Sequence, residues 1–510
     1  MSTRRLWALA AVIVLGVAGR LLFAFHLDEE LPLEGLYVDE RVYAQGLRSL
    51  SESAFERPPG MYLLADLLRA EEDPFSARLA LSAVSLLPAV LLLFMLPDRS
   101  WSMLVSVLVA VDPHLILFGL QILPAVPACI LVTASLLMLR RGRFCFSGLL
   151  LGLACLFRSE VAVLVPLLSI WGLIAGLRAS ELLRAPGVAL VVLLPVMALN
   201  MSSDGGPVLS TNAAENLWLG TSTDLVEVPP GLEFEELVAV RGGEGQQAFF
   251  FRRALNAVRE KPLHWLGLGL TKALRSLTLP GPGRNLEVAY LLRGWWSWVL
   301  LIPLAVFLSL GYARIRPAGE AWRILSYSCL LAVPLIAFVF FPAARYRLAF
   351  LPGAWMLAAA EFPRSREMPV AGAILLSILA LSLAVKWPAA TRDGTTQILR
   401  AEALLESGSP TAALETLREA SEERGFRGAD LANLSGIALM RMGRSEEGVA
   451  MFKRAIRQAP YSPTAWKNLA VALLRSGDRQ AAAEAAFEAV RIDPRLGEEL
   501  GPLMGVENPR

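Results

Sequence analysis

The sequence predicts an all-α protein in which a polytopic membrane domain is followed by an α-helical repeat domain. Hydrophobic residues make up 55% of the 510 residues, and the mean hydropathy is +0.51. A soluble domain of this size does not need that much apolar surface. From about residue 398 the chain instead becomes amphipathic and rich in Ala, Glu and Arg. We therefore assign residues 1–390 to the membrane domain and residues 398–496 to the repeat domain.

Apolar segments predict about eleven transmembrane helices. The first, from Leu6 to Phe25, follows Arg4 and Arg5, and no small-residue cleavage site comes after it. We therefore expect a retained span rather than a cleaved signal peptide. Ten further segments lie at residues 78–97, 101–118, 120–139, 144–157, 159–177, 185–203, 291–312, 324–341, 348–362 and 369–387. Several are shorter than a full crossing, so their boundaries are loose.

Basic residues predict the sidedness of these spans. Every second short loop carries arginine, and the loops concerned contain Arg99, Arg140, Arg141, Arg143, Arg178, Arg184, Arg314, Arg316, Arg323, Arg364 and Arg366. This alternation is the positive-inside pattern, and it places these loops and the N-terminus in the cytoplasm. Residues 262–280 are apolar but are interrupted by Lys272 and Arg275. We interpret that segment as an interfacial helix, because counting it as a span would place the arginine-containing loops that follow it on the outer face.

Two long loops and the tail then lie on the outer face. The loops cover residues 26–77 and 202–290, and long loops between spans often carry function.

The net charge of +2 does not suggest a nucleic-acid partner. All four cysteines sit inside apolar runs, so their spacing predicts neither a disulfide framework nor a zinc site.

The tail repeats with a period of 34 residues. Ala455 and Ala489 are 34 residues apart, and so are Pro460 and Pro494. The corresponding small, bulky and proline positions are Gly436, Phe452, Ala455 and Pro460, then Trp466, Ala470, Ala482, Ala489 and Pro494, with a weaker copy at Ala413, Leu417 and Ala420. The pattern resembles the tetratricopeptide repeat, which implies a concave surface for a protein partner or peptide. A helical hairpin domain that only adds stability is the alternative.

Two adjacent carboxylates, Asp39 and Glu40, follow the first span. Such a pair can act as a general base, bind a divalent cation or simply be solvated. Tyr43 and Leu47 lie four residues apart, which predicts that the pair opens a helix with a buried apolar face. The dipole of that helix would keep Asp39 ionised.

A cation stands before the next predicted helix. Arg57 precedes Pro58, Pro59 and Gly60, and proline is favourable at a helix start. A cation beside free N–H groups suits a phosphate. An ordinary interfacial arginine is the alternative.

These motifs together resemble the polyprenyl-phosphate-dependent glycosyltransferases of the GT-C fold. The similar stretches are Asp39-Glu40-x-x-Tyr43, Arg57-Pro58-Pro59-x-x-Tyr62, residues 75–79, residues 148–154 with Arg158-Ser159-Glu160, residues 212–220, and Arg345-Tyr346-Arg347-Leu348 followed by Pro352. Within that fold, these motifs are most similar to those of the protein O-mannosyltransferases and the aminoarabinose transferases of lipid A. The resemblance covers about residues 1–390.

The resemblance implies an enzyme of the bacterial inner membrane. It would transfer a sugar from a polyprenyl-phosphate donor to a protein, lipid or glycan acceptor on the outer face, by a single inverting displacement. Its implied site residues are Asp39 as the base or acceptor-positioning carboxylate with Glu40 in support, Arg57, Arg345, Tyr346 and Arg347 around the donor phosphate, and Tyr43, Arg158, Asn212, Glu215 and Asn216 in the substrate cleft. Arg158 could equally sit at an outer span end, and the residues of loop 202–290 could serve as caps.

One departure from the family concerns metal binding. Many relatives have a second carboxylate near the outer end of the third or fourth span, where residues 121–127 of this chain contain no acid. Use of a divalent cation, with Asp39 as its ligand, is therefore left open. Two other functions also stay open, a lipid-linked glycan ligase or polymerase and a non-enzymatic membrane-anchored assembly factor that works through its repeats.

Overall fold

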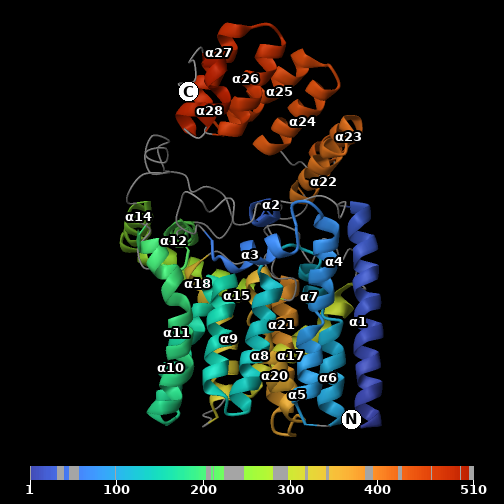
Figure 1. The fold of residues 1–510 in the computed structure, drawn as a ribbon, viewed down its shortest axis with the longest axis vertical. Coiled ribbons are helices and arrows are strands. Elements are labelled where there is room, and N and C mark those ends of the chain that lie inside the picture. Colours follow the sequence, from blue (N-terminus) through green and yellow to red (C-terminus); the bar gives the residue numbers. More distant parts are fainter. Residues whose placement is uncertain are drawn as a thin grey trace. The chain divides into compact units, whose positions relative to one another are not determined.

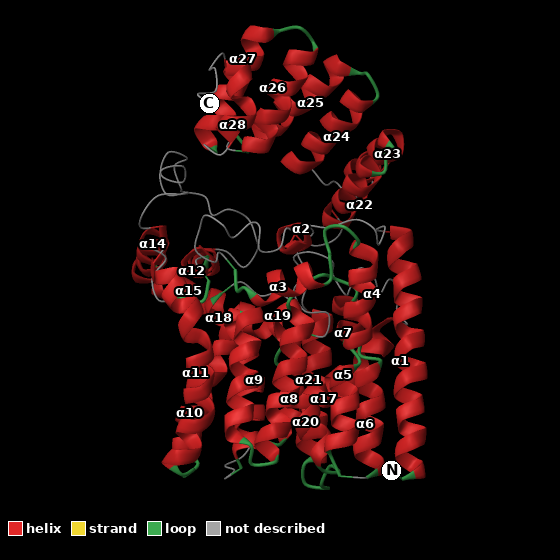
Figure 2. Cartoon of the chain, in the orientation of Figure 1, coloured by secondary structure: helices red, strands yellow, loops and turns green. Residues whose placement is uncertain are grey.

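The computed structural model describes residues 2–30, 39–44, 57–97, 99–202, 208–210, 212–222, 246–278, 297–315, 320–340, 344–384, 394–422, 428–460, 462–493 and 496–504. All regular structure in these ranges is helical, which confirms the all-α prediction (Figure 2). The chain divides into two compact units. The larger consists of Met1–Glu29, Leu33–Pro229 and Gly245–Lys386, and most of the smaller is Trp387–Arg510.

The larger unit is a bundle of helices (Figure 1). Its first part contains α1 (Thr3–Glu30), α2 (Asp39–Ala44), α3 (Gly60–Leu67), α4 (Pro74–Val84), α5 (Leu87–Met95), α6 (Ser100–Ala110), α7 (Pro113–Gly119), α8 (Ala125–Arg140), α9 (Phe144–Phe157), the 3-10 helix η2 (Ser159–Val163), α10 (Leu164–Ile174) and α11 (Ala179–Ser202). Its second part contains α12 (Ala213–Ser222), α14 (Gln246–Glu260), α15 (Pro262–Ser276), α17 (Ser297–Ala313), α18 (Ala321–Val339), α19 (Ala344–Leu348), α20 (Leu351–Ala360) and α21 (Met368–Ala384).

Several of these helices are long and apolar enough to cross a membrane. Four pass that test among the described residues: Thr3–Phe25, Pro74–Met95, Leu183–Met201 and Ala321–Val339. A fifth candidate is the pair α6 and α7, which is bent by 42°. Six shorter apolar helices accompany them: Ala125–Arg140, Phe144–Phe157, Ser159–Ile174, Leu301–Ala313, Leu351–Ala360 and Met368–Ser382. The described residues thus contain four or five clear spans, fewer than the eleven that the sequence predicts.

The bend between α6 and α7 has a local cause. Pro113 lacks a backbone N–H, so it cannot continue the hydrogen bonding of α6 but is well suited to begin a helix. Asp112 caps the new helix, because its Oδ1 accepts the backbone N–H of His114 at 2.9 Å. The chain therefore changes direction at a buried carboxylate.

The bundle has two ends, and we name them by what they carry. The site end carries α2, α3, α12 and α19, and the opposite end carries the start of α1, the start of α6 and the end of α20 (Figure 2). At the opposite end Arg5 Nη2 donates to the carbonyl of Leu96 at 2.6 Å, and Trp101 Nε1 donates to the carbonyl of Ala358 at 2.7 Å. These bonds tie α1 to α5 and α6 to α20.

Helix α20 lies at the centre of the bundle. All ten of its residues are buried, and it packs against α18, α17, α6 and α8. Gly353 permits the closest of these contacts, because a Cβ there would lie 2.6 Å from Cys329 Cβ on α18. The final carbonyls of a helix lack intrahelical partners. In α20 they accept side-chain donors from α6 and α17, including Ser102 Oγ at 2.7 Å from the oxygen of Ala359.

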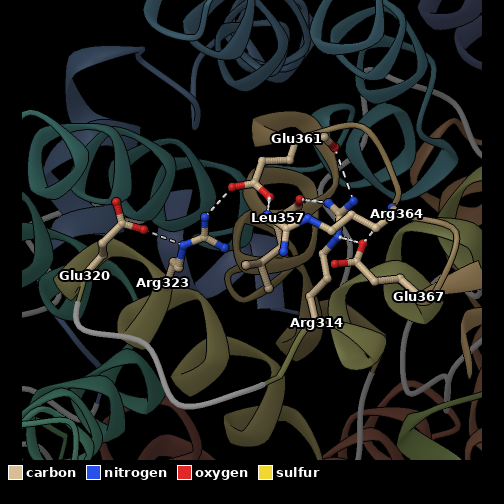
Figure 3. A network of polar contacts seen from close by, with 7 residues as sticks. All are labelled: Arg314, Glu320, Arg323, Leu357, Glu361, Arg364 and Glu367. Carbon is tan, nitrogen blue, oxygen red and sulfur yellow. Dashed lines mark hydrogen bonds and ion pairs between the residues drawn. The ribbon is translucent and has the colours of Figure 1, made fainter.

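Arginines and glutamates form a network around the end of α20 (Figure 3). Arg323 pairs with Glu320 and Glu361, and Arg364 also reaches Glu361, at 3.3 Å. Burial alone would raise the pKa of Glu361, but the hydrogen bond and charge of Arg323 lower that pKa below its usual value. The loops that join α17 to α18 and α20 to α21 are thereby held together. Within the same network, Arg314 donates to the carbonyl of Leu357 and pairs with Glu367.

The smaller unit consists of paired helices. They are α22 (Gly394–Glu406) with α23 (Pro410–Glu422), α24 (Ala429–Arg441) with α25 (Ser445–Gln458), and α26 (Pro463–Arg475) with α27 (Arg479–Ile492), followed by α28 (Gly497–Leu500) and the 3-10 helix η5 (Gly501–Met504). Each pair turns at a glycine with positive φ: Gly408 at 78°, Gly443 at 77° and Gly477 at 87°. These glycines recur at about the same interval as the predicted repeat.

Several of the repeat positions predicted from the sequence lie where the paired helices cross, whereas Pro494 lies outside the described residues. Phe452 is buried on α25, and a Cβ on Gly436 of α24 would lie 2.6 Å from its ring. Ala455 and Ala489, 34 residues apart, are both fully buried. In the pair α24 and α25 a small residue therefore allows a close approach against an aromatic side chain.

We predict that Gly436→Ala destabilises the smaller unit. The added methyl group would overlap the Phe452 ring, and overpacking of this kind costs about 1–3 kcal/mol. Hydrogen exchange of the full chain should show amides of α24 and α25 exchanging about tenfold faster for each 1.4 kcal/mol lost. The control Ala450→Ser changes an exposed position of α25 and should leave these rates nearly unaltered. Equal rates in both variants would contradict the close crossing.

Candidate functional site

A buried ion pair fixes α2 at the site end. Arg78 on α4 binds Glu40 on α2 through two bonds, Nη1 to Oε1 at 2.7 Å and Nη2 to Oε2 at 2.6 Å. Their side chains are only 1% and 3% exposed. Glu40 Oε1 also accepts the N–H of Ile122 at 2.8 Å, and Arg78 Nη1 donates to the carbonyl of Leu120 at 2.8 Å. Both buried charges are therefore hydrogen-bonded from more than one side, the condition under which such a pair is tolerated.

Asp39, the predicted catalytic residue, is the first residue of α2. This is the helix start that the sequence predicts. The side chain of Asp39 and the whole of Leu47 lie outside the described residues. The predicted support of Asp39 by Glu40 stays a prediction, and the structure gives Glu40 a partner of its own in Arg78.

Arg57 lies next to α2. Its guanidinium carbon is 5.4 Å from the centre of the Tyr43 ring, and that ring is 5.2 Å from the ring of Tyr62 on α3. Helix α3 begins at Gly60, where a Cβ would lie 2.7 Å from the carbonyl oxygen of Leu156 on α9. The start of α3, which follows Pro58 and Pro59, is therefore in close contact with the last turn of α9. Arg158 follows that turn.

Arg158 and Arg345 share one aromatic ring. Their guanidinium carbons lie 4.6 Å and 5.6 Å from the centre of the Tyr346 ring on α19. Arg158 also pairs with Glu160 at 2.8 Å. Two guanidinium groups and the carboxylate of Glu160 thus lie around this ring. A cation over an aromatic face is attracted to the ring, which helps to orient the cation.

Arg347 has a different setting from Arg345. It is buried, donates to the carbonyl of Thr278 and contacts His114 Nε2 on α7. The other ring nitrogen of His114 lies 3.5 Å from Asp112 Oδ1. Arg347 therefore joins α19 to α7 and to the end of α15, a structural role beside the phosphate-binding role predicted for it.

The predicted cleft residues of the second loop lie at the start of α12. Asn212 Oδ1 accepts a hydrogen bond from Ser210 Oγ at 2.5 Å, and its carbonyl accepts the N–H of Asn216 at 3.0 Å. Glu215 lies in the first turn of the same helix. Asn212 thus stands just before α12, and its side chain bonds the preceding loop residue Ser210; the cleft role stays a prediction. Trp218, one turn further on, packs against α14.

The site end thus brings together two groups of the predicted residues. Glu40, Tyr43 and Arg57 form one group around α2, and the cluster around Tyr346 forms the other. The contact between α3 and α9 joins them. No group of three or more His, Cys, Asp and Glu side chains that could hold a metal gathers within the described part of the chain.

Sequence reasoning assigned no role to three buried side chains, Arg78, His114 and Lys272. Lys272 is fully buried and donates to the carbonyls of Gly220 at 2.5 Å and Phe340 at 2.9 Å. It therefore ties α15 to the ends of α12 and α18. A signal was present, because an ionisable residue inside an apolar segment is costly unless it has a partner.

Comparison with known proteins bears on the smaller unit. A family model described as tetratricopeptide repeat matches residues 433–496. The match covers α24 to α27 and confirms the predicted repeat. A search of curated proteins finds no match for the chain.

We predict that Arg78→Met destabilises the larger unit strongly. The substitution leaves the Glu40 carboxylate buried without its cation, which costs about 3–5 kcal/mol. Thermal unfolding of the detergent-solubilised chain should show a large fall in Tm, and Glu40→Gln in the same chain should restore part of it. The control Glu72→Gln breaks an exposed pair with Arg69 and should cost less than about 1 kcal/mol. Similar losses in Arg78→Met and Glu72→Gln would refute the role of the buried pair.

Proposed function

We propose that the larger unit is a membrane glycosyltransferase that uses a polyprenyl-phosphate sugar as donor. The observation that carries this proposal is the cluster of Arg158, Arg345 and Tyr346 at the same end of an apolar bundle as α2, the helix that Asp39 begins. A lipid phosphate needs cations at the end of apolar helices, where its polyprenyl chain can lie among them. The GT-C-like order of motifs along residues 1–390 supports the same proposal.

The proposed topology has eleven spans. Each of the eleven apolar segments of the sequence corresponds to one long helix, to the bent pair α6 and α7, or to one of the six shorter apolar helices. In the proposed orientation the opposite end faces the cytoplasm, since Arg99, Arg140 and Arg323 lie there. The site end then faces the outside of a bacterial inner membrane, where the donor's sugar is presented.

The proposed reaction is a single displacement. A hydroxyl or amine of the acceptor attacks the anomeric carbon of the sugar, and the bond from that carbon to the phosphate oxygen breaks. The bonding electron pair leaves with the polyprenyl phosphate, and the proton of the acceptor passes to Asp39. The anomeric centre is inverted. The donor already carries a good leaving group, so positioning and charge stabilisation provide most of the catalysis.

The contacts of the site residues suggest how the roles divide. Arg345, held on the Tyr346 ring, would stabilise the charge on the departing phosphate, with Arg57 at the start of α3. Arg158, which is buried and paired with Glu160, would hold the Tyr346 ring in place. Arg347 would keep α19 in place through Thr278 and His114. Glu40 would hold α2 through Arg78, so that Asp39 is presented at a fixed position.

A second role is favoured by the family match in the tail. Tetratricopeptide repeats commonly bind other proteins, so the smaller unit would recruit a protein acceptor or a partner of the enzyme. If this were the whole function, the chain would be an assembly factor and the charged residues of the site end would be dispensable.

A lipid-linked glycan ligase or polymerase would also use the site end, but with a pyrophosphate-linked glycan.

We predict that Asp39→Asn abolishes sugar transfer while the protein still folds. The amide keeps the size of the side chain but cannot accept the acceptor's proton, and loss of a positioned base lowers rates by about 10²–10⁴-fold. Mass spectrometry of envelope proteins and lipids should show a sugar that is present with the wild-type chain and absent with the variant. Unchanged glycosylation at normal expression would refute the enzyme proposal and favour the assembly factor.

We predict that Arg345→Ala weakens donor binding. Removal of one charge-assisted contact to a phosphate costs about 1.5–3 kcal/mol, or roughly 10–100-fold in Kd. Native mass spectrometry of the purified chain with undecaprenyl phosphate provides the measurement. Arg364→Ala, an exposed arginine of the opposite end, is the matched control and should bind like the wild type. Equal weakening by both substitutions would indicate a general charge effect and remove Arg345 from the site.

A further inference from the structure

Helices α14 and α15 form a strongly basic elbow, by which we mean residues 246–278. Its charged side chains are Arg252, Arg253, Arg259, Glu260, Lys261, Lys272 and Arg275. Six cations therefore accompany one carboxylate in a chain whose net charge is only +2. Arg252 in the middle of α14 is exposed, and so are Arg259 and Lys261 at the junction of the two helices. The elbow is thus a local concentration of positive charge at the site end.

Large apolar side chains are exposed beside these cations. Leu263, Leu266, Leu270 and Leu274 are 82%, 44%, 52% and 51% exposed. Their spacing of three and four residues places them on one face of α15. We call them the leucine stripe. Phe251 and Leu255 of α14 are also exposed, at 49% and 37%.

The other face of α15 packs against the bundle. Trp265 stacks edge-on against Phe338 of α18, with ring centres 5.0 Å apart. A Cβ on Gly269 would lie 2.7 Å from the same Phe338 ring. Lys272 on this face binds the carbonyls of Gly220 and Phe340. The helix is therefore fixed to the unit on one side and presents leucines on the other.

We propose that the elbow is seated on the bilayer surface and binds the phosphate headgroups of anionic phospholipids. Arg252, Arg259 and Lys261 contact the headgroups, and the leucine stripe enters the acyl region beneath them. An exposed apolar face flanked by Lys and Arg is the composition of helices that lie in a membrane interface. The excess of cations selects anionic over zwitterionic lipids, because each adds attraction to a negatively charged surface.

The elbow is also connected to the site. Thr278, two residues beyond α15, accepts the hydrogen bond of Arg347, and Lys272 holds the residue that follows α18. Helix α19, which carries Arg345 and Tyr346, begins four residues after Phe340. Lipid bound at the elbow therefore stabilises the segment from which α19 is presented. This connection does not depend on which reaction the site performs.

The test places a fluorophore on the leucine stripe. Leu263→Cys in a Cys145→Ser background is labelled, and the full chain is reconstituted in phosphatidylcholine nanodiscs. Spin-labelled phosphatidylglycerol or spin-labelled phosphatidylcholine is then titrated in as a quencher. We expect both to quench, and phosphatidylglycerol to reach half-quenching at a several-fold lower mole fraction. Inorganic phosphate at millimolar concentration should not change the result, which separates a lipid headgroup from a free anion.

The charge requirement is tested with matched variants. The triple variant Arg252→Gln, Arg259→Gln and Lys261→Gln should lose the preference for phosphatidylglycerol while keeping quenching by both lipids. Because each cation near an anionic membrane surface contributes up to about fivefold in affinity, loss of these three is enough to abolish a several-fold preference. The control Lys453→Gln, Arg457→Gln and Arg479→Gln removes the same charge from exposed positions of the smaller unit and should keep it.

Three results would overturn the proposal. Equal quenching by the two lipids in the wild-type chain would remove the anionic selectivity. Absence of quenching by either would mean that the stripe faces a protein surface. Displacement of the anionic quencher by inorganic phosphate would assign the cations to a soluble anion.

Discussion

Charged side chains inside an apolar bundle have to be neutralised by other segments, and this requirement organises the larger unit. Glu40 and Arg78 neutralise each other across α2 and α4. Arg20 of α1 is buried and has no carboxylate within bonding distance among the described residues. It donates instead to the carbonyls of Ser82, Gly16 and Ala110 and to Ser85 Oγ, at 2.7–2.9 Å. Because an unpaired charge in such a place costs several kcal/mol, each partner fixes which helices can be neighbours.

The same requirement separates two kinds of cation at the site end. Arg78, Arg347 and Lys272 are buried and bind backbone carbonyls or a carboxylate of distant segments. Arg57 and Arg345 are only half-buried, and each lies against an aromatic ring. The first kind connects helices to one another, and the second kind is oriented by an aromatic ring. A site for an anion needs both, since flexible cations would lose entropy on binding and buried ones would be inaccessible.

Local sequence patterns predicted much of this arrangement. Alternation of apolar and basic segments predicted the helices of the larger unit, and the 34-residue period predicted the repeat, because both patterns arise from neighbours along the chain. Partners such as Lys272 with Gly220 and Phe340, 52 and 68 residues away, leave no such local pattern. The sequence therefore showed Lys272 as a charge inside an apolar segment but could not say what Lys272 binds, and it gave no sign of the partners of Arg78 and His114. Helix length also depends on segments that are distant in the sequence. Helix α20 has only ten residues, and all of them are buried by neighbouring helices.

The shortness of α20 bears on the depth of the site. Ten helical residues rise about 15 Å, whereas a bilayer's hydrocarbon core is about 30 Å thick. In the proposed orientation α20 ends at the cytoplasmic surface beside Glu361, so α19, which precedes α20 at the site end, would lie below the outer surface of the membrane. Tyr346 and its two arginines would then occupy the floor of a recess. The phosphate of a bound lipid would have to lie deeper than the headgroups of the surrounding lipids to reach these arginines. It would lose bound water there and gain hydrogen bonds from guanidinium groups.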